Sequence, residues 1–136
     1  MMRISWEEHA MNLAVGASLR SEDPYQKVGA CILDHDNDVL AVAYNGLVSG
    51  LNVPKEFWKD RDKRRPYMIH AEANALARIR RGEGSLIACT LLPCSSCAMN
   101  IVAHGIKKVL YKEVYHRDTS SLDIFKFYEI SCKQLN

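Results

Sequence analysis

The chain has 136 residues, of which 48% are hydrophobic and 25% are charged, and its formal net charge is +2. These values are ordinary for a globular protein, and we expect residues 1–136 to form a single domain. The small net charge gives no reason to expect nucleic-acid binding. There is no apolar run long enough to span a membrane and no leader-like N-terminus, so we expect a cytoplasmic protein without a membrane partner.

The first half of the chain predicts a helix, a hairpin and a long loop. Residues 5–19 begin with Ser5 and carry Glu8 three positions later, which is typical of a helix N-terminus. Residues 28–34 and 39–45 are rich in strand-forming side chains, and the turn residues "HDND" between them indicate a hairpin. Residues 46–69 have no clear periodicity, and a loop of that length is often functional.

The second half alternates between helices and strands. The sequence predicts helices at 72–81, 95–105 and 119–129, and strands at 85–92, 107–113 and 130–135. Strands joined through helices usually pair in parallel, with helices covering the sheet. We therefore predict an α/β fold with three α/β/α layers. Its five-stranded mixed sheet would have one antiparallel pair, the hairpin, and a parallel remainder.

Two of the five cysteines are spaced as metal ligands. Cys94 and Cys97 stand three positions apart at the start of a predicted helix, where both can face the same side. His70 begins another predicted helix and can supply a third ligand. Three protein ligands with an open fourth position are typical of catalytic zinc, whereas a structural site closes all four. A structural site closed by His104 and a redox-active pair of cysteines are the alternatives.

Glu72 lies two positions after His70, and this spacing needs an explanation. On an ideal helix, positions i and i+2 point about 200° apart, so both side chains can reach one metal only beyond the helix N-terminus. Two helix N-termini would then face the ion and favour the thiolate forms of the cysteines. Glu72 is not needed as a ligand, and a carboxylate beside the metal can move protons between water and a substrate.

Taken together, the segments "HAEANAL" and "PCSSC" resemble the cytidine deaminase superfamily. The segments R-S-x-D-P, Y-N-G and Y-H-x-D narrow the resemblance to the deoxycytidylate deaminases. This resemblance implies a fold of the cytidine deaminase type and hydrolysis of dCMP to dUMP and ammonia, which supplies thymidylate synthesis. It also implies one Zn²⁺ held by His70, Cys94 and Cys97, with Glu72 as the proton shuttle.

The resemblance further implies a set of substrate contacts. Asn45 occupies the position of an asparagine that meets the sugar in relatives, and Ala71 belongs to the substrate pocket. Tyr115 stands where relatives place an aromatic residue near the base or the phosphate. Arg20 and Ser21 are candidates for contacts with the phosphate, because a nucleotide monophosphate needs cationic or hydroxyl partners.

Regulation is also implied by the resemblance. Such enzymes are typically homohexamers that dCTP activates and dTTP inhibits, with Mg²⁺ on the triphosphate. Two departures stand out, because Ala43 replaces the first glycine of the usual G-Y-N-G, and residues 51–69 lack the cysteines and histidines with which some relatives hold a second zinc. The candidate effector contacts are Lys27, Asn45, Gly46, Gly50 and Arg117.

Three other functions share part of this pattern. A tRNA adenosine deaminase has both metal-site motifs, and the basic clusters "KDRDKRR" and "RIRR" could be taken for its RNA surface. A deaminase that also accepts dCTP would have the same pocket chemistry with different phosphate contacts. A zinc-stabilised nucleotide sensor would need no catalysis, but a purely structural site has no use for the carboxylate of Glu72.

Overall fold

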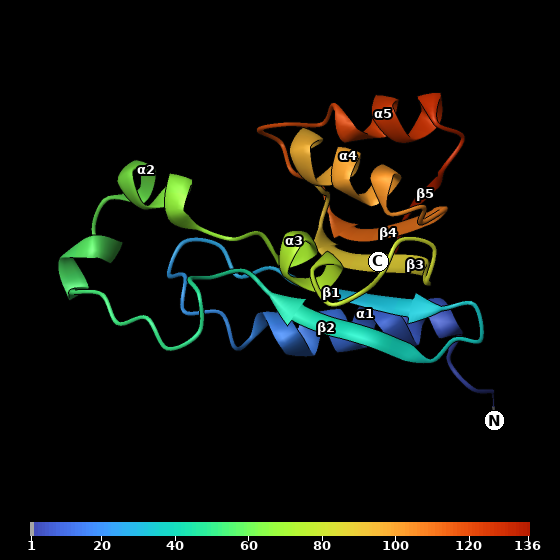
Figure 1. The fold of residues 1–136 in the computed structure, drawn as a ribbon, viewed down its shortest axis with the longest axis horizontal. Helices are drawn as coiled ribbons and strands as arrows, with labels where there is room; N and C mark the ends of the chain where they lie inside the picture. The colour runs from blue at the N-terminus through green and yellow to red at the C-terminus, as the bar shows by residue number, and fades with distance from the viewer. Residues whose placement is uncertain (1) are drawn as a thin grey trace.

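The computed structural model describes residues 2–136, and Figure 1 gives their course from the N-terminus to the C-terminus. The helices are α1 (Trp6–Ser18), α2 (Arg61–Arg64), α3 (Ala71–Leu76), α4 (Ser95–Ala103) and α5 (Ser121–Phe127), with the 3-10 turns η1 (Lys55–Trp58) and η2 (Arg65–Tyr67). The strands are β1 (Gly29–Asp34), β2 (Val39–Tyr44), β3 (Gly84–Leu91), β4 (Lys108–Glu113) and β5 (Ser131–Gln134). The predicted hairpin and the order of the later elements are thus confirmed.

The five strands form one mixed sheet in the order β2-β1-β3-β4-β5. β1 pairs antiparallel with β2 on one side and with β3 on the other, while β3–β4 and β4–β5 are parallel. The prediction of a single antiparallel pair was therefore wrong. The chain does run from β2 through α3 to a strand of the same direction, but β1 lies between β2 and β3 and separates them.

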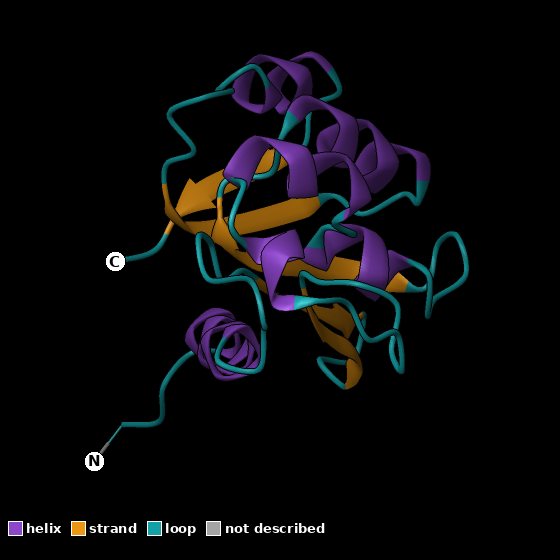
Figure 2. Cartoon of the chain, turned by 90° about the vertical axis from the view of Figure 1, so that its left-hand side faces the viewer, coloured by secondary structure: helices purple, strands orange, loops and turns teal. Residues whose placement is uncertain are grey.

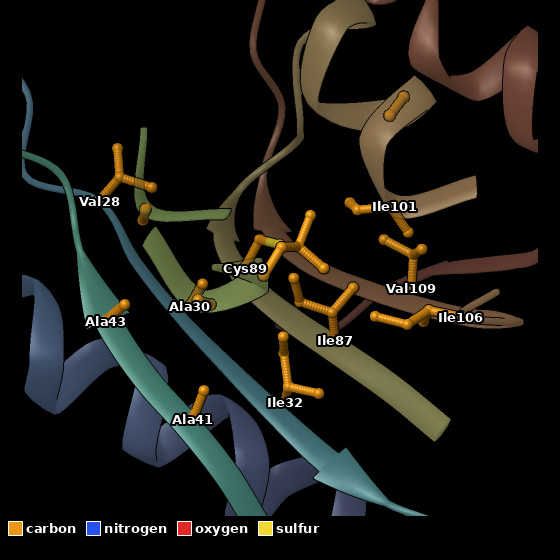
Figure 3. Packing of buried hydrophobic residues seen from close by; sticks show 14 of the residues in the cluster. Val28, Ala30, Ile32, Ala41, Ala43, Ile87, Cys89, Ile101, Ile106 and Val109 are labelled. Carbon is orange, nitrogen blue, oxygen red and sulfur yellow. The ribbon is translucent and has the colours of Figure 1, made fainter. Parts of the chain in front are cut away.

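Helices cover both faces of the sheet. α1 packs on one face, and α3, α4 and α5 lie on the other, which gives the predicted three layers (Figures 1 and 2). The alternation of side chains in β1 serves both cores, because Ala30 and Ile32 belong to the cluster under α3, α4 and α5. Cys31 and Leu33 belong to the cluster under α1. Figure 3 shows the larger cluster, with Ile32, Ile87 and Val109 rising from three adjacent strands.

The helix N-termini follow the sequence more closely than the C-termini. Ser5 caps α1 as predicted, because its hydroxyl accepts a hydrogen bond from the Glu8 N–H at 3.0 Å. The helix predicted over 72–81 was too long, since α3 ends at Leu76. Beyond it the chain tightens into turns with i to i+3 bonds, and Ile79 packs against the sheet core.

Residues 46–69 are a structured excursion rather than an irregular loop. The segment contains η1, α2 and η2, and Figure 1 shows it extending beyond the end of the sheet. Its two ends are joined by an antiparallel bridge between Gly46 and Ile69. The segment therefore begins directly after β2 and ends beside its own start, directly before His70. None of the described helices is long and apolar enough to cross a membrane.

Candidate active site

The two predicted metal motifs meet at the N-termini of two helices. His70 is the N-cap of α3 and Cys94 is the N-cap of α4, and both have extended backbones with ψ values of 151° and 172°. Neither side chain makes the hydrogen bond to its own helix that an N-cap residue normally supplies. Both side chains are therefore free of their helices and turn toward each other, in the arrangement that the spacing of His70 and Glu72 predicts.

The distances between these side chains fit a zinc ion. The Nδ1 atom of His70 lies 3.6 Å from the Cys94 sulfur and 3.3 Å from the Cys97 sulfur. All three candidate ligand atoms lie within 4.8 Å of one another. In a tetrahedral zinc site the nitrogen and sulfur ligands are roughly 3.6 Å apart, so the three side chains suit this metal without a large rearrangement.

His104, which the alternative of a closed structural site would need as its fourth ligand, lies elsewhere. His104 is at the opposite end of α4, where it is the C-cap and its Nδ1 lies 3.0 Å from the Asn100 carbonyl oxygen. Among the described residues, the group that could hold a metal consists of His70, Cys94 and Cys97. Burial is graded across this triad, because His70 is exposed and Cys97 is buried. The three side chains are therefore accessible from the His70 side, where His70 and Cys94 line a cavity.

Glu72 is the buried carboxyl group of this site. It lies in the first turn of α3 and is only 4% exposed. Burial raises the pKa of Glu72, because a charged carboxylate is poorly solvated there, while its own backbone N–H and nearby His70 act in the opposite direction. A carboxyl group with a raised pKa is suited to both accept and return a proton near neutral pH.

Of the two thiols, Cys94 is held in its charged form by its neighbours, whereas the hydrogen bond with Cys94 raises the pKa of Cys97. A hydrogen bond from Cys97, and after it one from His70, holds the pKa of the Cys94 thiol well below its usual value. The hydrogen bond with Cys94 raises the pKa of His70, so an imidazolium facing a thiolate is favoured when no metal is bound. A cation at this point replaces the protons, because metal ligation requires a thiolate and a neutral imidazole.

A cavity opens beside the triad at the end of the sheet where β2, β3 and β4 finish. Cys94 and Tyr115 follow the carboxyl ends of the parallel strands β3 and β4, and Asn45 follows β2, which runs in the same direction. In α/β folds such strand ends are the usual place for ligands. The cavity is lined by Asp23, Gln26, Val28, Asn45, Arg61, Arg64, Arg65, Met68, His70, Ala71, Glu72, Leu91, Leu92, Cys94, Tyr115 and Arg117.

The residues predicted to contact ligands fall into two groups. Asn45, Ala71, Tyr115 and Arg117 line the cavity together with Glu72. The others do not line the cavity, and all but Gly50 are engaged with other parts of the protein. Arg20 donates to the Tyr44 hydroxyl at 3.4 Å, and Ser21 donates to the Asn45 carbonyl at 2.9 Å. The Lys27 ammonium donates to the Ser21 carbonyl. Gly46 pairs with Ile69, and Gly50 turns the chain with a φ of +88°.

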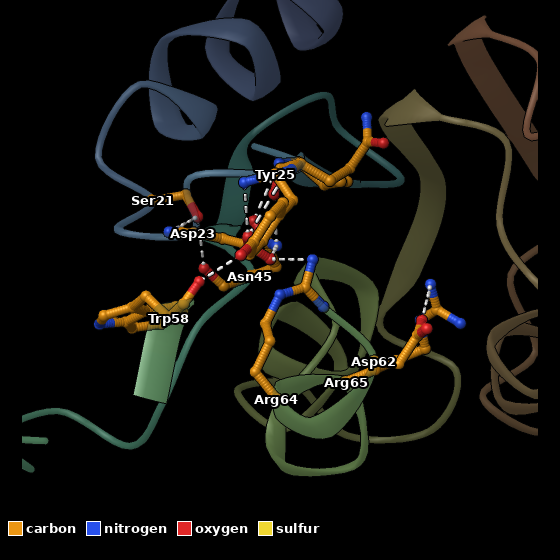
Figure 4. A network of polar contacts seen from close by, with 10 residues as sticks. Ser21, Asp23, Tyr25, Asn45, Trp58, Asp62, Arg64 and Arg65 are labelled. Carbon is orange, nitrogen blue, oxygen red and sulfur yellow. Dashed lines mark hydrogen bonds and ion pairs between the residues drawn. The ribbon is translucent and has the colours of Figure 1, made fainter. Parts of the chain in front are cut away.

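Asn45 is tied into a buried polar network (Figure 4). Its amide nitrogen donates to the Gln26 carbonyl at 2.8 Å and to Asp23 Oδ2 at 3.4 Å. Its Oδ1 accepts from the Val28 N–H at 2.9 Å. Both amide protons are therefore engaged within the protein, and Oδ1 retains one lone pair with which it can accept a hydrogen bond from a ligand hydroxyl.

Tyr115 and Arg117 are carried by a short loop that is fastened to the metal-site helix. The Oδ2 atom of Asp118 accepts from the Ser95 N–H at 2.9 Å, directly after Cys94. Its Oδ1 accepts from the Ser120 N–H at 3.0 Å. A hydrogen bond from the Ser120 hydroxyl to Oδ1, and after it the bonds from the Ser95 and Ser120 N–H groups, hold the pKa of Asp118 well below its usual range. Asp118 thus links the cavity loop after β4 to the N-terminus of α4.

Sequence reasoning missed the three arginines of residues 61–65. Arg61, Arg64 and Arg65 all line the cavity, and Arg64 is only 5% exposed. The charged run "KDRDKRR" was considered only as a possible RNA surface, which the acids within it argue against, and none of its residues was predicted to contact a ligand. The signal that could have identified them is position, since the run lies shortly before His70 in a segment whose length already suggested a function.

Comparison with known proteins agrees with this geometry. Residues 4–113 match the model of the cytidine and deoxycytidylate deaminase zinc-binding region. The deoxycytidylate deaminases of Pongo abelii and Homo sapiens are each 33% identical over 121 residues, which cover 83% of this chain and 68% of theirs.

A solved structure shows the same arrangement of the fold. The dCMP deaminase of the cyanophage S-TIM5, determined in complex with dCMP and dUMP, superposes with a TM-score of 0.80 at 27% identity. That comparison covers 99% of this chain and all of the phage chain. The sequence, the fold and the His/Cys/Cys group agree. The chain therefore belongs to the cytidine and deoxycytidylate deaminase family, and within it to the deoxycytidylate deaminases.

Proposed function

We propose that this protein hydrolyses dCMP to dUMP and ammonia, using a Zn²⁺ ion held by His70, Cys94 and Cys97. The observation that carries the proposal is the position of Glu72, buried beside the three converging ligand atoms and lining the same cavity. A sensor or a structural zinc site has no need of a buried carboxyl group there. A buried carboxyl group costs free energy, which is expected where it serves catalysis.

The chain's own residues account for the proton movements of the reaction. When bound, zinc supplies Lewis acidity that lowers the pKa of water to about 7. Glu72 takes a proton from the attacking water at its carboxylate and delivers it to N3 of the cytosine ring as the water oxygen adds to C4. Glu72 then receives the second proton of that oxygen and gives it to the amino group, which departs as ammonia. The raised pKa of Glu72 suits it to both steps.

The cavity wall supports a nucleotide rather than a free nucleoside. Four arginines line it, against the two carboxyl groups of Asp23 and Glu72. Arginine is well suited to phosphate because its planar guanidinium offers paired N–H donors. Asn45 Oδ1 is available to a sugar hydroxyl, and Tyr115 offers an aromatic face to the base or the phosphate. This combination supports dCMP over deoxycytidine as the substrate.

The decisive test compares Glu72→Gln with the parent protein. Ammonia release from dCMP should fall by about a thousandfold or more, because glutamine cannot shuttle protons. Zinc content should stay at the parental level, because Glu72 is not a ligand. The matched control is Glu8→Gln in α1 on the opposite face of the sheet, which should leave turnover unchanged. Parental turnover by Glu72→Gln would overturn the mechanism.

The finer expectations belong to the same proposal. We infer a cytoplasmic homohexamer that dCTP activates and dTTP inhibits, each with Mg²⁺, on the basis of the resemblance to regulated relatives. Ammonia release from dCMP, measured with and without each triphosphate, tests the regulation, and sedimentation tests the assembly. Turnover that neither triphosphate alters would leave the reaction in place and remove the regulation. Including dCTP itself as a substrate tests the wider specificity.

A further inference from the structure

The arginines of residues 61–65, which we call the arginine segment, form one wall of the cavity. Arg61, Arg64 and Arg65 reach this wall from α2 and the start of η2, and Arg117 joins them from the loop after β4. Arg65 also meets Asp62 at 3.4 Å, but that pair is exposed and contributes little. The wall thus carries an excess of positive charge in the same cavity as Glu72.

The segment is fastened to the protein through two residues that follow α1. Arg64 Nη2 lies 3.1 Å from Asp23 Oδ2, and both side chains are almost completely buried. The other oxygen of Asp23 accepts from the Tyr25 N–H at 2.9 Å. A buried ion pair needs good geometry and further hydrogen bonds to offset the loss of hydration, and this pair has them.

Tyr25 holds the segment at three further points (Figure 4). Its ring lies 4.9 Å from the guanidinium carbon of Arg64 and 5.8 Å from that of Arg61. Its hydroxyl donates to the Trp58 carbonyl at the end of η1. Cations over an aromatic face are attracted to it, so one side chain fixes both arginines and the turn that precedes them.

Arg64 keeps a free donor in this setting. Its Nε–H is buried and has no hydrogen-bond partner among the described residues 2–136. A buried guanidinium N–H without an acceptor is costly, so an acceptor supplied by a ligand would be strongly favoured. The anionic oxygens of a phosphate monoester meet this need and also match the positive charge of Arg61, Arg65 and Arg117.

We propose that Asp23 and Tyr25 are positioning residues that hold the arginine segment against the cavity, and that this arrangement makes the enzyme select a phosphate monoester over the free nucleoside. The inference rests on the proposed function and deepens it. It predicts that loosening the segment weakens recognition of the phosphate and leaves the chemistry at the base intact.

The experiment measures kcat and KM for dCMP and for deoxycytidine on zinc-loaded protein. The parent should prefer dCMP by roughly 100-fold or more, as expected for charged hydrogen bonds to phosphate. Tyr25→Phe removes only the bond to Trp58 and should reduce this preference by a few-fold. Tyr25→Leu also removes the ring and should reduce it by about tenfold, through a higher KM for dCMP at an almost unchanged kcat.

The ion pair is tested with the double variant Asp23→Asn/Arg64→Gln, which leaves no unpaired buried charge. Because Asp23 also accepts a hydrogen bond from Asn45, both substrates are measured in the same variant, and the ratio of kcat/KM for dCMP to that for deoxycytidine should fall about 10- to 100-fold. Arg81→Gln, an exposed arginine outside the cavity, is the matched control and should leave this ratio unchanged. Zinc content and circular dichroism confirm that each variant is folded and loaded.

Two outcomes would overturn the inference. One is a parent enzyme that uses deoxycytidine as well as dCMP, and the other is a set of variants that lose both substrates equally, as a merely structural role requires. Calorimetric binding of dUMP and deoxyuridine separates this inference from the proposed reaction. A parent that turns over neither substrate but prefers dUMP, with that preference lost in the variants, would refute the reaction and support the positioning role.

Discussion

At the scale of single residues, the candidate site depends on three ligand atoms supplied by two separated motifs. The sequence predicted His70, Cys94 and Cys97 because each motif stands at the start of a helix and because Glu72 is out of phase with His70. The structure brings the three ligand atoms to within 4.8 Å of one another. Local spacing was informative here because the rigid geometry of a helix N-terminus determines where the side chains point.

The three ligands should also stabilise the fold. Cys97→Ser is expected to lower zinc content and the melting temperature together, because metal binding and folding are thermodynamically coupled. The matched control is Cys132→Ser, a partly buried cysteine on β5 outside the triad, which should retain full zinc. Metal content by mass spectrometry and thermal unfolding check the result. Full zinc occupancy in Cys97→Ser would show that the ligand set is wrong.

The arginines of residues 61–65 could not be assigned from the sequence. Their role depends on partners in residues 21–28, from which they are separated by the whole hairpin. Arg64 is buried where it meets the Asp23 carboxylate and the Tyr25 ring, and no local pattern reports such a pairing. A charged run of mixed sign is usually a solvated surface. Long-range contacts, rather than residue types, decide that this run lines a cavity.

At the scale of elements, the packing of α1 on β1 depends on a residue without a side chain. A Cβ atom at Gly29 would lie 1.8 Å from the Ala14 carbonyl oxygen and 2.8 Å from the Ser18 nitrogen. Both are backbone atoms of α1. The Gly29 N–H also donates to the Thr90 hydroxyl at 3.0 Å, which ties β1 to β3. The helix and the strand therefore touch at this point.

Gly29→Ala is accordingly expected to destabilise the protein by about 3 kcal/mol or more, because backbone must move to admit the methyl group. Gly16→Ala in α1 is the matched control, since no atom lies within 4 Å of the added carbon. That change should stabilise the protein by about 0.5–1 kcal/mol, because alanine favours helix. Urea unfolding of both variants measures these differences. Equal stability of the two variants would contradict the close packing.

The element boundaries show which part of a helix is visible in the sequence. The N-termini of α1, α3 and α4 were predicted to within one residue. A capping serine marks the start of α1, whereas α3 and α4 begin at the histidine and the cysteine of the metal motifs. The C-terminus of α3 was misplaced by five residues because "ARIRR" has good helix formers throughout. The chain leaves the helix there so that Ile79 can join the core. Tertiary packing thus overrides local propensity at that end.

At the scale of the whole molecule, the sheet order was only partly predictable. The sequence indicated which strands are joined through helices, but not that β3 would take its place beside β1. The pairing of β1 with β3 is a long-range contact, and no local pattern in either strand specifies it. The position of the site at the carboxyl ends of β2, β3 and β4 follows from this order.

Buried and partly buried cysteine thiols on both sides of the sheet imply that the protein loses stability at alkaline pH. Burial raises the pKa of both Cys31 and Cys132 to about 11. Because these thiols ionise more easily in the unfolded chain, their contribution to stability is intact below about pH 9 and is lost as the pH approaches 11. The free energy of unfolding, measured with urea at pH 8 and pH 10.5, should therefore fall as the pH rises.

Cys31→Ala should reduce that pH dependence, because Cys31 is completely buried and its thiol is removed. Ile87→Val on β3 is the control, since it weakens the same sheet without removing an ionisable group and should keep the parental slope. An unchanged slope in Cys31→Ala would mean that the alkaline loss arises from other groups. Zinc is kept in excess throughout, so that ionisation at the metal site does not enter the comparison.

The uncapped starts of α3 and α4 set a limit on how this protein could be improved. Serine, aspartate or asparagine at an N-cap typically stabilises a helix by about 1 kcal/mol, and positions 70 and 94 carry none of them. A laboratory selection that rewarded heat resistance alone, in a medium without metal, would favour such residues at both positions. The selected variants would be more stable, but they would lack two zinc ligands and the catalytic activity that depends on them. The folding optimum and the catalytic optimum of this chain therefore lie at different sequences.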